Sequence, residues 1–423
     1  MTPQGEGRRV VVVGQGYVGL GLAMQAVAAG HAVVGYELDD ERVKRLAAGI
    51  SHVEDVPDDQ LAAALATERY LPTSRITDCS EFDVCVIAVP TPLREGVPDL
   101  SHIEDAGAAV AGFVRAGATV VLESTTYPGT TEELLIPILE AGSGLTAGVD
   151  FHVGYSPERI DPGNREWTLA NTPKVVSGMN ESSLAAVQSF YDSFVERTVA
   201  ISGTKEAELT KLLENTFRHV NIALVNELAM FAHDLGIDVW EAIDAASTKP
   251  FGFMRFEPGP GVGGHCLPID PSYLSWQVRR RLGQHFRFVE LANDVNDHMP
   301  AYVVRRLSVA LNQQSKTVNG SRILMLGMAF KRNTADAREA PAIRLGNQLV
   351  DLGADVRAAD PYVAEEIGER FLRVELTNEE LAAADAVLVI TDHDVFDYDA
   401  VAQHARYVLD TRRRVVGNQV EHL

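Results

Sequence analysis

The 423-residue sequence lacks the features that mark several large classes of protein. It contains only three cysteines, Cys79, Cys85 and Cys266, and their spacing is not that of a metal site. No apolar run approaches the roughly 18 residues that a membrane-spanning helix needs. The N-terminal residues lead into an apolar run that is too short for a signal peptide. The sequence therefore predicts a cytoplasmic globular protein with no membrane segment and no bound metal.

Positive charge is also scarce, because 37 lysines and arginines face 59 acidic residues and leave a net charge of −22. Such a charge opposes long-range attraction to nucleic acid and leaves phosphate recognition to local basic side chains. We expect no nucleic-acid partner, and we expect an anionic substrate to bind in a locally basic pocket. The length exceeds that of one ordinary core and predicts two or three domains.

A glycine-rich turn follows the first predicted strand. Residues 9–13 form a short β-branched run, and a GxGxxG pattern then leads into a helix-prone stretch. A strand, a glycine turn and a helix in this order are typical of a dinucleotide-binding fold, in which the helix N-terminus faces the pyrophosphate. We expect five residues of this turn to contact the cofactor: Gly14, Gly16, Tyr17, Val18 and Gly19.

An acidic residue stands at the end of the second predicted strand, residues 32–36. Glu37 lies about 20 residues after the glycine turn, where a carboxylate accepts hydrogen bonds from a ribose diol and repels a 2′-phosphate. This position favours NAD over NADP. We expect Arg42 either to bond the adenosine side of the cofactor or to be an exposed arginine on the next helix.

Polar turns follow two further predicted strands, residues 84–89 and 119–123. Ligands of a doubly wound sheet bind beyond the carboxyl ends of its strands. Thr91, Ser124 and Thr125 follow those ends and are predicted to line the nicotinamide side of the site. The alternative is that these hydroxyl groups cap helices.

Glu158 follows another predicted strand, residues 151–155, in a proline-rich loop. A carboxylate held in such a loop can act on water or on a hydroxyl group. The alternative is a surface ion pair of Glu158 with Arg159 or Arg165.

A long helix is predicted from residue 205 to residue 235, because apolar side chains recur there with a helical period. They lie on more than one face, which indicates burial between domains or at a subunit interface, and we favour a homodimer. Lys211 and Asn215 are four residues apart and point the same way from adjacent turns. They are predicted to offer an ammonium and an amide N–H to one oxygen atom. The alternative for Lys211 is a solvated surface charge.

Residues 258–271 hold four glycines and four prolines around Cys266, and Asp270 follows four residues later. This composition argues against a regular helix and a central strand, and it predicts a shaped loop. Glycine N–H groups can approach a ligand closely, and a thiol beside a carboxylate can serve as a nucleophile. The alternative is a connecting loop whose cysteine is simply buried. We call residues 258–271 the cysteine segment.

Strand-like runs recur at residues 322–326, 355–358, 386–390 and 407–409, which predicts a second parallel sheet without a GxGxxG turn. Lys331 and Arg338 follow its first strand and are candidates to bind phosphate. The predicted fold class is therefore α/β, with two Rossmann-like doubly wound parallel sheets joined by a long-helix domain. The predicted domains are residues 1–200, 201–315 and 316–423.

These motifs resemble, in their kinds and in their order, the UDP-glucose/GDP-mannose dehydrogenase family of nucleotide-sugar 6-dehydrogenases. The motifs are GxGxxG with Glu37, Thr91 within VPTP, Ser124 with Thr125, Glu158 within SPE, Lys211 with Asn215, Cys266 within GGHC with Asp270, and Lys331 with Arg338. The resemblance covers nearly the whole chain. It implies an NAD-binding first domain, a central dimerising domain and a nucleotide-sugar-binding third domain. It also implies oxidation of a sugar C6 alcohol to a carboxylate with two NAD.

The resemblance implies a role for each matching residue. Cys266 would carry a thiohemiacetal and then a thioester, while Lys211 and Asn215 would stabilise the successive oxyanions. Asp270, Glu158 and Thr125 would orient or deprotonate water or the alcohol, and Arg338 would contact cofactor phosphate. Some members carry a second acid four residues after Glu158, where this chain has Pro162 with Asp161 beside it. The implied substrate-binding residues are Glu158, Arg159, Lys211, Asn215, Arg255, Gly261, Gly263, Gly264, Phe330 and Lys331.

The cysteine segment also bears on the choice of substrate. It contains GGHC-x-P-x-D-P, whereas members acting on UDP-glucose or GDP-mannose more often resemble GGSC-x-x-K-D. This difference favours a UDP-N-acetylhexosamine substrate, such as the mannosamine or glucosamine derivative, with UDP-glucose or a dTDP-sugar as the alternative. A short-chain epimerase would need Tyr-x-x-x-Lys, which is absent, and a two-electron alcohol dehydrogenase would not need Cys266. A nucleotide-sugar-binding protein without catalysis is the non-enzyme alternative.

Overall fold

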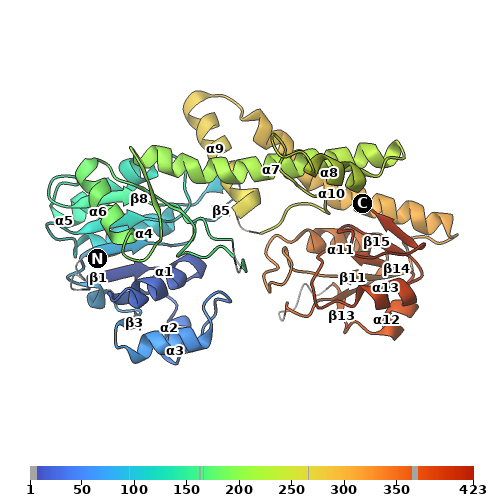
Figure 1. The fold of residues 1–423 in the computed structure, drawn as a ribbon, viewed down its shortest axis with the longest axis horizontal. Coiled ribbons are helices and arrows are strands. Elements are labelled where there is room, and N and C mark those ends of the chain that lie inside the picture. The colour runs from blue at the N-terminus through green and yellow to red at the C-terminus, as the bar shows by residue number, and fades with distance from the viewer. Residues whose placement is uncertain (1–6, 95, 162, 165, 265, 364–369) are drawn as a thin grey trace. The chain divides into compact units, whose positions relative to one another are not determined.

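The computed structural model describes the chain except for residues 1–6, 95, 162, 165, 265 and 364–369 and the side chains of Cys266 and Pro268. The chain divides into two compact units, Met1–Glu214 and Asn215–Leu423. The division falls inside the long helix α7 (Thr204–Asp234), which contributes residues to both units (Figure 1).

The first unit is built on a parallel sheet. Six described strands lie in the order β3-β2-β1-β4-β7-β8. They are β1 (Arg9–Val13), β2 (Ala32–Tyr36), β3 (Tyr70–Thr73), β4 (Val84–Ile87), β7 (Thr119–Leu122) and β8 (His152–Tyr155). This is the doubly wound order, and its direction reverses between β1 and β4, where such folds bind their ligands. The predicted fold class is confirmed for this unit.

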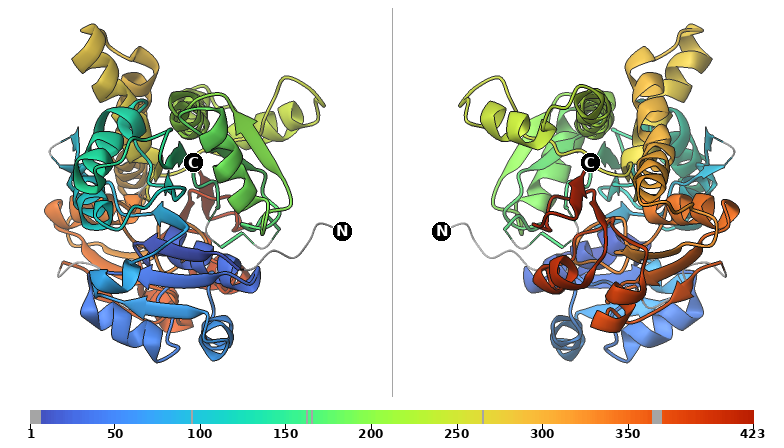
Figure 2. Two further views of the ribbon diagram at one scale, coloured as in Figure 1. Left: turned by 90° about the vertical axis from the view of Figure 1, so that its left-hand side faces the viewer. Right: turned by 90° about the vertical axis from the view of Figure 1, so that its right-hand side faces the viewer.

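Helices cover both faces of this sheet (Figures 1 and 2). The helices are α1 (Tyr17–Ala28), α2 (Asp40–Ala47), α3 (Asp58–Ala66), α4 (Ser101–Ala111), α5 (Ile136–Ser143) and α6 (Glu181–Tyr191). Val11 and Val13 of β1 pack with α4 and α5, whereas Val10 and Val12 pack with α1, α3 and α6. Successive strand side chains point to opposite faces, so a strand covered on both faces must be apolar throughout. This explains the unbroken valine run.

Shorter elements complete the first unit. They are the single turns η1 (Ile76–Cys79) and η2 (Thr131–Leu135), the antiparallel pair β5 (Leu93–Arg94) and β6 (Val97–Pro98), and the parallel pair β9 (Lys174–Ser177) and β10 (Thr198–Ile201). The sequence had not predicted β9 and β10. Strand β9 brings Lys174 into the interior, where its side chain is only 4% exposed.

The second unit repeats the doubly wound order. Among the described residues, six parallel strands follow the order β13-β12-β11-β14-β15-β16. They are β11 (Arg322–Leu326), β12 (Asp355–Ala359), β13 (Leu372–Arg373), β14 (Ala386–Val389), β15 (Val408–Asp410) and β16 (Val420–His422). Gly327 follows β11 with φ of +83°, and a Cβ atom there would lie 2.1 Å from the Thr391 carbonyl oxygen. The strand order confirms the predicted second Rossmann-like sheet, in which the tight turn at Gly327 stands in place of the GxGxxG pattern.

Helices cover both faces of the second sheet as well. The helices of this unit besides α7 are α8 (Val239–Ser247), α9 (Cys266–Leu282), α10 (Arg287–Gln313), α11 (Pro341–Asp351), α12 (Asn378–Ala383) and α13 (Tyr398–His404). Ile323 and Met325 of β11 pack with α10 and α11, whereas Leu324 and Leu326 pack with α12 and α13. Within the described residues, no helix is both long enough and apolar enough to cross a membrane.

The prediction of a non-helical cysteine segment is wrong in its second half. The segment is irregular up to Gly264, but Cys266 is the first residue of α9, and the helix continues through Pro268 and Pro271. Pro268 lies in the first turn, where an N–H has no partner within the helix, so the proline ring removes no hydrogen bond. Pro271 removes one hydrogen bond near the start of this 17-residue helix.

Candidate active site

The glycine turn after β1 has the shape that a dinucleotide requires. Gly14 has φ of +89°, and a Cβ atom there would lie 2.6 Å from the Ala88 carbonyl oxygen. A Cβ atom at Gly19 would lie 1.9 Å from the Gly14 oxygen, so this glycine allows α1 to pack on the turn. Gly16, in contrast, has nothing within 4 Å of its Cβ position among the described atoms, and no described side chain caps the start of α1. Tyr17 and Val18 open the first turn of that helix, so the residues fit a bound pyrophosphate.

Glu37 lies directly beside this turn. Its Oε2 accepts hydrogen bonds from the Gln15 N–H at 3.2 Å and from the Arg42 guanidinium at 2.9 Å. Its side chain is 12% exposed, so the carboxylate is fixed yet accessible. The structure thus brings Glu37 and Arg42 to the rim of the turn, as expected of residues at the adenosine ribose.

His52 is a further residue at this turn that the sequence had not singled out. Its Nε2 lies 2.8 Å from the Gln15 main-chain oxygen, which can only accept, so Nε2 donates. Burial is the main cause that lowers the pKa of His52, which favours the neutral ring. His52 lies in the loop between α2 and α3, and no motif connects it with the glycine turn.

The predicted nicotinamide side is assembled from the loops after β4 and β7. The Thr91 hydroxyl donates to the Thr125 main-chain oxygen at 2.8 Å, and the Ser124 hydroxyl donates to the Val89 oxygen at 2.8 Å. These hydroxyl groups therefore tie the two loops together rather than cap helices. Thr91, Ser124 and Thr125 lie together at the carboxyl edge of the sheet, next to its switch point.

Glu158 lies in a buried ionic cluster. Lys174 Nζ is 2.8 Å from Glu123 Oε1 and 3.1 Å from Glu158 Oε2, and the Tyr191 hydroxyl donates to Glu123 Oε1 at 2.6 Å. The predicted alternative of a surface pair with Arg159 is wrong, because the Arg159 guanidinium contacts Glu214 instead, at 2.6 Å. Arg165, the other alternative partner, lies outside the described residues, as does Pro162.

The two carboxyl groups of this cluster differ in acidity. Burial raises the pKa of Glu123 above its ordinary value, against the pull of Lys174. Burial also acts to raise the pKa of Glu158, but the Lys174 ammonium, the Ile160 N–H and the Lys211 ammonium outweigh it and hold that pKa below the ordinary value. Burial lowers and both carboxylates raise the pKa of Lys174, and the net shift is upward. Glu158 and Lys174 are therefore both charged at neutral pH.

The two polar residues of α7 are buried and bonded to different acceptors. Lys211 Nζ donates to the Glu158 main-chain oxygen at 2.5 Å. Asn215 Nδ2 donates to Asp270 Oδ2 at 2.5 Å, and both of these side chains are at most 5% exposed. The interpretation of Lys211 as a solvated surface charge is wrong, because only 9% of the residue is exposed.

The irregular half of the cysteine segment is anchored by its glycines. Gly261 and Gly264 have φ of +126° and +83°. Cβ atoms at Gly263 and Gly264 would lie 2.9 and 2.8 Å from Phe330 atoms, and the Gly264 N–H donates to the Arg338 main-chain oxygen at 3.1 Å. The structure thus brings the predicted glycines, Phe330 and the main chain of Arg338 together.

Asn226 and Asn296 hold the same segment and were not predicted. Asn226 Oδ1 accepts the Gly259 N–H at 2.9 Å, and its Nδ2 donates to Asn296 Oδ1 at 2.9 Å. Asn226 stands eleven residues after Asn215 on α7, about three turns, so the two lie on nearly the same face. That spacing is the one sequence signal that could have identified it.

The thiol of Cys266 lies outside the described side chains, so its role stays a prediction. The other two cysteines are buried, and burial raises the pKa of Cys79 to about 12 and that of Cys85 well above its ordinary value. Neither forms a thiolate at neutral pH, and the thiolate is the nucleophilic form. Cys266 is thus the remaining candidate for a nucleophilic thiol.

The three predicted basic residues, Arg338, Lys331 and Arg255, lie in different environments. Arg338 Nε donates to Asp336 Oδ1 at 2.9 Å, and Lys331 is half-buried in the turn after β11. Arg255 lies 2.8 Å from Asp244 and 2.9 Å from Glu257. In this structure Arg255 and Arg338 are thus held by carboxylates.

Glu208 of α7 fixes the loop that carries Thr125. Its carboxylate accepts the Gly129 N–H at 2.5 Å and the Thr131 N–H and hydroxyl at 2.8 and 2.7 Å. Burial outweighs these three donors and raises the pKa of Glu208 from 4.5 to about 7. The folded first unit therefore binds a proton at Glu208 more tightly than the unfolded chain does.

This difference predicts a pH-dependent stability. The contribution of Glu208 is fully present below pH 4.5 and is lost as the pH rises toward about 7, because the unfolded chain ionises first. We expect wild type to lose stability relative to Glu208→Gln in this range by up to about 1.4 kcal/mol per pH unit. Urea unfolding at a series of pH values measures it. Glu206→Gln, an exposed carboxylate on the same helix, is the control. Parallel curves for wild type and Glu208→Gln would refute the assignment.

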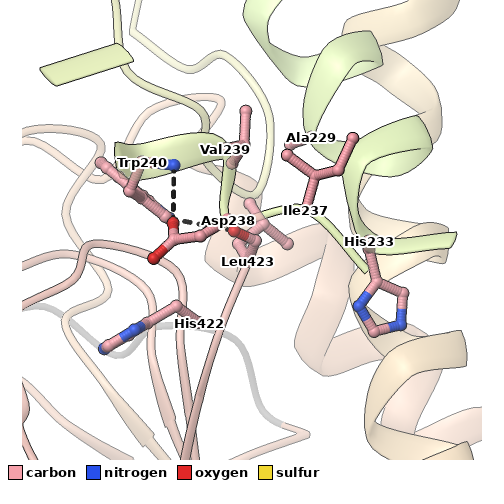
Figure 3. Close-up of a pocket in the computed structure, with 8 residues that line it drawn as sticks. All are labelled: Ala229, His233, Ile237, Asp238, Val239, Trp240, His422 and Leu423. Carbon is pink, nitrogen blue, oxygen red and sulfur yellow. Dashed lines mark hydrogen bonds between the residues drawn. The ribbon is translucent and has the colours of Figure 1, made fainter. Parts of the chain in front are cut away.

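A small cavity of about 120 Å³ lies in the second unit (Figure 3). Its lining residues are Ala229, His233, Ile237, Asp238, Val239, Trp240, His422 and Leu423. The Trp240 indole N–H donates to the Leu423 oxygen at 2.9 Å at its edge. None of the predicted site residues lines this cavity. Among the described residues, no group of three or more His, Cys, Asp or Glu side chains is placed to hold a metal ion.

Comparison with known proteins agrees with this arrangement. Three sequence models of the UDP-glucose/GDP-mannose dehydrogenase family match the chain: the NAD binding domain over residues 8–195, the central domain over 205–298 and the UDP binding domain over 324–417. The chain is 36% identical over 410 residues to UDP-N-acetyl-D-mannosamine dehydrogenase of Pyrococcus horikoshii, an alignment that covers 96% of this chain and 95% of that protein. It is 38% identical over 360 residues to UDP-N-acetyl-D-glucosamine 6-dehydrogenase of Pseudomonas aeruginosa, with 85% and 84% covered.

The fold is similar to solved structures as well. The structure of a UDP-glucose dehydrogenase from Pyrobaculum islandicum matches with a TM-score of 0.89 at 28% identity, covering 100% of this chain and 98% of that one. The glycine turn with Glu37 fits the cofactor that the first family model names. The chain therefore belongs to the UDP-glucose/GDP-mannose dehydrogenase family and is an NAD-dependent nucleotide-sugar dehydrogenase.

Proposed function

We propose that this protein oxidises the C6 hydroxyl group of a UDP-N-acetylhexosamine to a carboxylate. The observation that carries the proposal is its 36% and 38% identity to dehydrogenases named for UDP-N-acetyl-D-mannosamine and UDP-N-acetyl-D-glucosamine. The GGHC-x-P-x-D-P cysteine segment supports the same choice. The fold does not separate the alternatives, because a UDP-glucose dehydrogenase matches it with a TM-score of 0.89.

The first unit is proposed to bind NAD at the turn formed by Gly14, Gly16 and Gly19. Glu37 would accept the ribose hydroxyls, with Arg42 beside it, and Thr91, Ser124 and Thr125 would line the nicotinamide side. Arg338 would contact cofactor phosphate. Bound NAD supplies the hydride acceptor, and each sugar needs two of them because the alcohol loses four electrons.

Cys266 is proposed as the covalent catalyst. The first oxidation removes a hydride and a proton from the C6 alcohol and leaves an aldehyde. The thiolate adds to the aldehyde carbon and the oxygen takes up a proton, which gives a thiohemiacetal. Loss of a second hydride and of a proton then leaves a thioester. Water then hydrolyses the thioester, which releases the acid and regenerates the thiol. The position of Cys266 as the first residue of α9 supports this role, because negative charge is favoured near the N-terminus of a helix.

Polar side chains would stabilise and activate the reacting groups. Lys211 and Asn215 would stabilise the successive oxyanions, as donors at such a position do. Asp270 would orient or deprotonate the alcohol or water, and its bond to Asn215 supports a shared task. Glu158 and Thr125 would act in hydrolysis. The division of acid and base work among these groups is part of the proposal.

The third domain, proposed as residues 316–423, would hold the UDP part of the substrate. A family model for the UDP binding domain matches residues 324–417 and supports this assignment. The proposed first two domains are residues 1–200 and 201–315. The proposed substrate contacts outside the catalytic groups are Arg159, Arg255, Gly261, Gly263, Gly264, Phe330 and Lys331. A cytoplasmic location stays part of this proposal.

A substrate series tests the proposed function. Purified protein and NAD would be assayed with UDP-N-acetylmannosamine, UDP-N-acetylglucosamine, UDP-glucose and dTDP-glucose, and NADH and acid would be counted per sugar. We expect two NADH and one acid per sugar, with kcat/KM for an N-acetylhexosamine at least about tenfold above that for the glucose derivatives, a ratio that one pocket contact can supply. Activity on UDP-glucose alone would end the substrate proposal. Ligand binding without any NADH would favour the inactive-binder alternative.

A homodimer is proposed from one face of α7. Six apolar side chains there, and Leu235 directly after the end of the helix, are each at least 41% exposed in the single chain; the six are Leu209, Leu213, Phe217, Leu224, Leu228 and Phe231. Their spacing puts them within one stripe about 100° wide along the helix. Lys211 and Asn215 lie on the opposite face, so one helix can serve both an interface and the site. A long apolar stripe of this kind needs a partner, and a second copy is the occupant that we propose.

Charged substitutions in this stripe are predicted to separate the subunits. We expect wild type to elute at twice the chain mass of 45.9 kDa in size-exclusion chromatography with light scattering. Leu224→Asp with Leu228→Asp is expected to elute at the chain mass, because burying two carboxylates at an apolar interface costs more than the contact yields. Arg218→Ala, exposed but outside the stripe, serves as the control. A wild type that elutes as a monomer, or a double variant that stays dimeric, would disprove this interface.

A further inference from the structure

The buried cluster beside Glu158 contains a lysine to which no motif assigns a task. Lys174, the first residue of β9, is 4% exposed at its side chain. Its ammonium lies between two carboxylates, at 2.8 Å from Glu123 and 3.1 Å from Glu158, and 5.3 Å from the ring centroid of Tyr191. We refer to Glu123, Glu158, Lys174 and Tyr191 as the Lys174 cluster. A charge enclosed in this way has one position and little freedom to leave it.

The Glu158 carboxylate also holds the main chain next to it in place. Its Oε1 accepts the N–H groups of Arg159 and Ile160, both at 2.6 Å, so the carboxylate closes a tight local turn. Its Oε2 faces Lys174. The side chain is therefore held at one end by its own loop and at the other by the ammonium.

The main-chain oxygen of this same residue receives Lys211. The Lys211 ammonium donates to it at 2.5 Å. The direction in which Lys211 points thus depends on the Glu158 carbonyl, and the carbonyl depends on the turn that the carboxylate closes. The four charged groups also balance, since Lys174 and Lys211 offset Glu123 and Glu158.

We infer that Lys174 is a positioning residue for the oxidation: by pairing with Glu158 it fixes the carbonyl group that aims the Lys211 ammonium. This inference rests on the proposed function in one respect, namely that Lys211 stabilises the oxyanions. The competing explanation is that Lys174 only neutralises two buried carboxylates. The two explanations differ in whether charge balance alone restores activity.

Three variants separate these explanations. Lys174→Met keeps an unbranched side chain but leaves two buried carboxylates beside one ammonium, so it is expected to lower Tm. Lys174→Met with Glu123→Gln removes one charge of each sign and restores the balance. Lys174→Arg keeps the charge but replaces the compact ammonium with a larger planar group. Tm, kcat, and KM for the UDP-sugar and NAD would be measured for each.

In these variants we expect kcat to fall while stability is kept. The double variant and Lys174→Arg should keep a Tm near that of wild type and unchanged KM values. Their kcat should fall by about a hundredfold, the loss that a misplacement of about 1 Å can cause. A kcat near that of wild type in either folded variant would overturn the inference. Loss of folding in both would also overturn it, because the ammonium would then serve the fold rather than the site.

Wild type, measured in the same assay, distinguishes a failure of the proposed function from a failure of the role of Lys174. If wild type forms no acid from any UDP-sugar, the proposed function fails, whatever the variants do. If wild type forms acid with two NADH and the balanced variants do the same at the same rate, only the role of Lys174 fails.

Discussion

Replacing Cys266 with serine is expected to abolish acid formation while leaving both ligands bound. A serine hydroxyl is not ionised at neutral pH and does not trap the aldehyde as a thiolate does. Rates of acid formation should fall by at least about a thousandfold, in line with the loss of other covalent nucleophiles. Affinities for NAD and for the UDP-sugar should stay within about twofold, because in the proposed mechanism the sulfur bonds to the sugar only after the first oxidation.

Product analysis by mass spectrometry and titration calorimetry measure the two quantities separately. Cys85→Ala provides a matched control, since it removes a different thiol from the core of β4. It should keep full activity at a small cost in stability. Acid formation by Cys266→Ser at the rate of wild type would contradict the covalent mechanism, and the enzyme would then release and recapture a free aldehyde.

Replacing Lys211 with methionine is expected to lower kcat by about a hundredfold to a thousandfold, as the loss of one oxyanion donor does. The residue is 9% exposed and its ammonium donates to a main-chain oxygen, so the charge acts in a site from which water is largely excluded. KM values should change much less than kcat, because the oxyanion forms only during the reaction.

Lys205 offers a matched control on the same helix. Its side chain is 47% exposed and lies 3.4 Å from Glu132, so Lys205→Met removes the same group from a solvated position. This control should keep its kcat, since exposed ion pairs contribute little. Equal rates for wild type and Lys211→Met would exclude Lys211 from oxyanion stabilisation. They would also remove the reason for Lys174 to position it.

Several elements were predictable from local sequence with high accuracy. The runs at 9–13 and 322–326 are β1 and β11, with the same bounds. The helix expected at 205–235 is α7, Thr204–Asp234, with each bound one residue away. These segments repeat one simple pattern over their whole length, and that pattern alone selects strand or helix. The glycine turn was equally predictable, because Gly14 and Gly19 each face a main-chain atom that leaves no room for a side chain.

The prediction of a non-helical cysteine segment is wrong in its second half, and the reason is physical. Glycines and prolines indicate an irregular chain, but the cost of a proline depends on its place in a helix. Pro268 lies in the first turn of α9, where it costs no hydrogen bond. Composition counts prolines without their positions, so the start of α9 at Cys266 was missed.

Strand runs, helical periods and turn glycines were enough to define the two sheets, the long helix and the nature of the cofactor, because each depends on neighbours along the chain. The ion pairs of the buried lysine could not be predicted from neighbours along the chain. Lys174 stands 51 residues after Glu123 and 16 after Glu158, between a proline and a valine. Its partners are set by where β7 and β8 end and where β9 begins in the folded chain. Burial makes that pairing compulsory, since an ammonium 4% exposed must be matched by carboxylates, and this constraint exists only once the chain has folded.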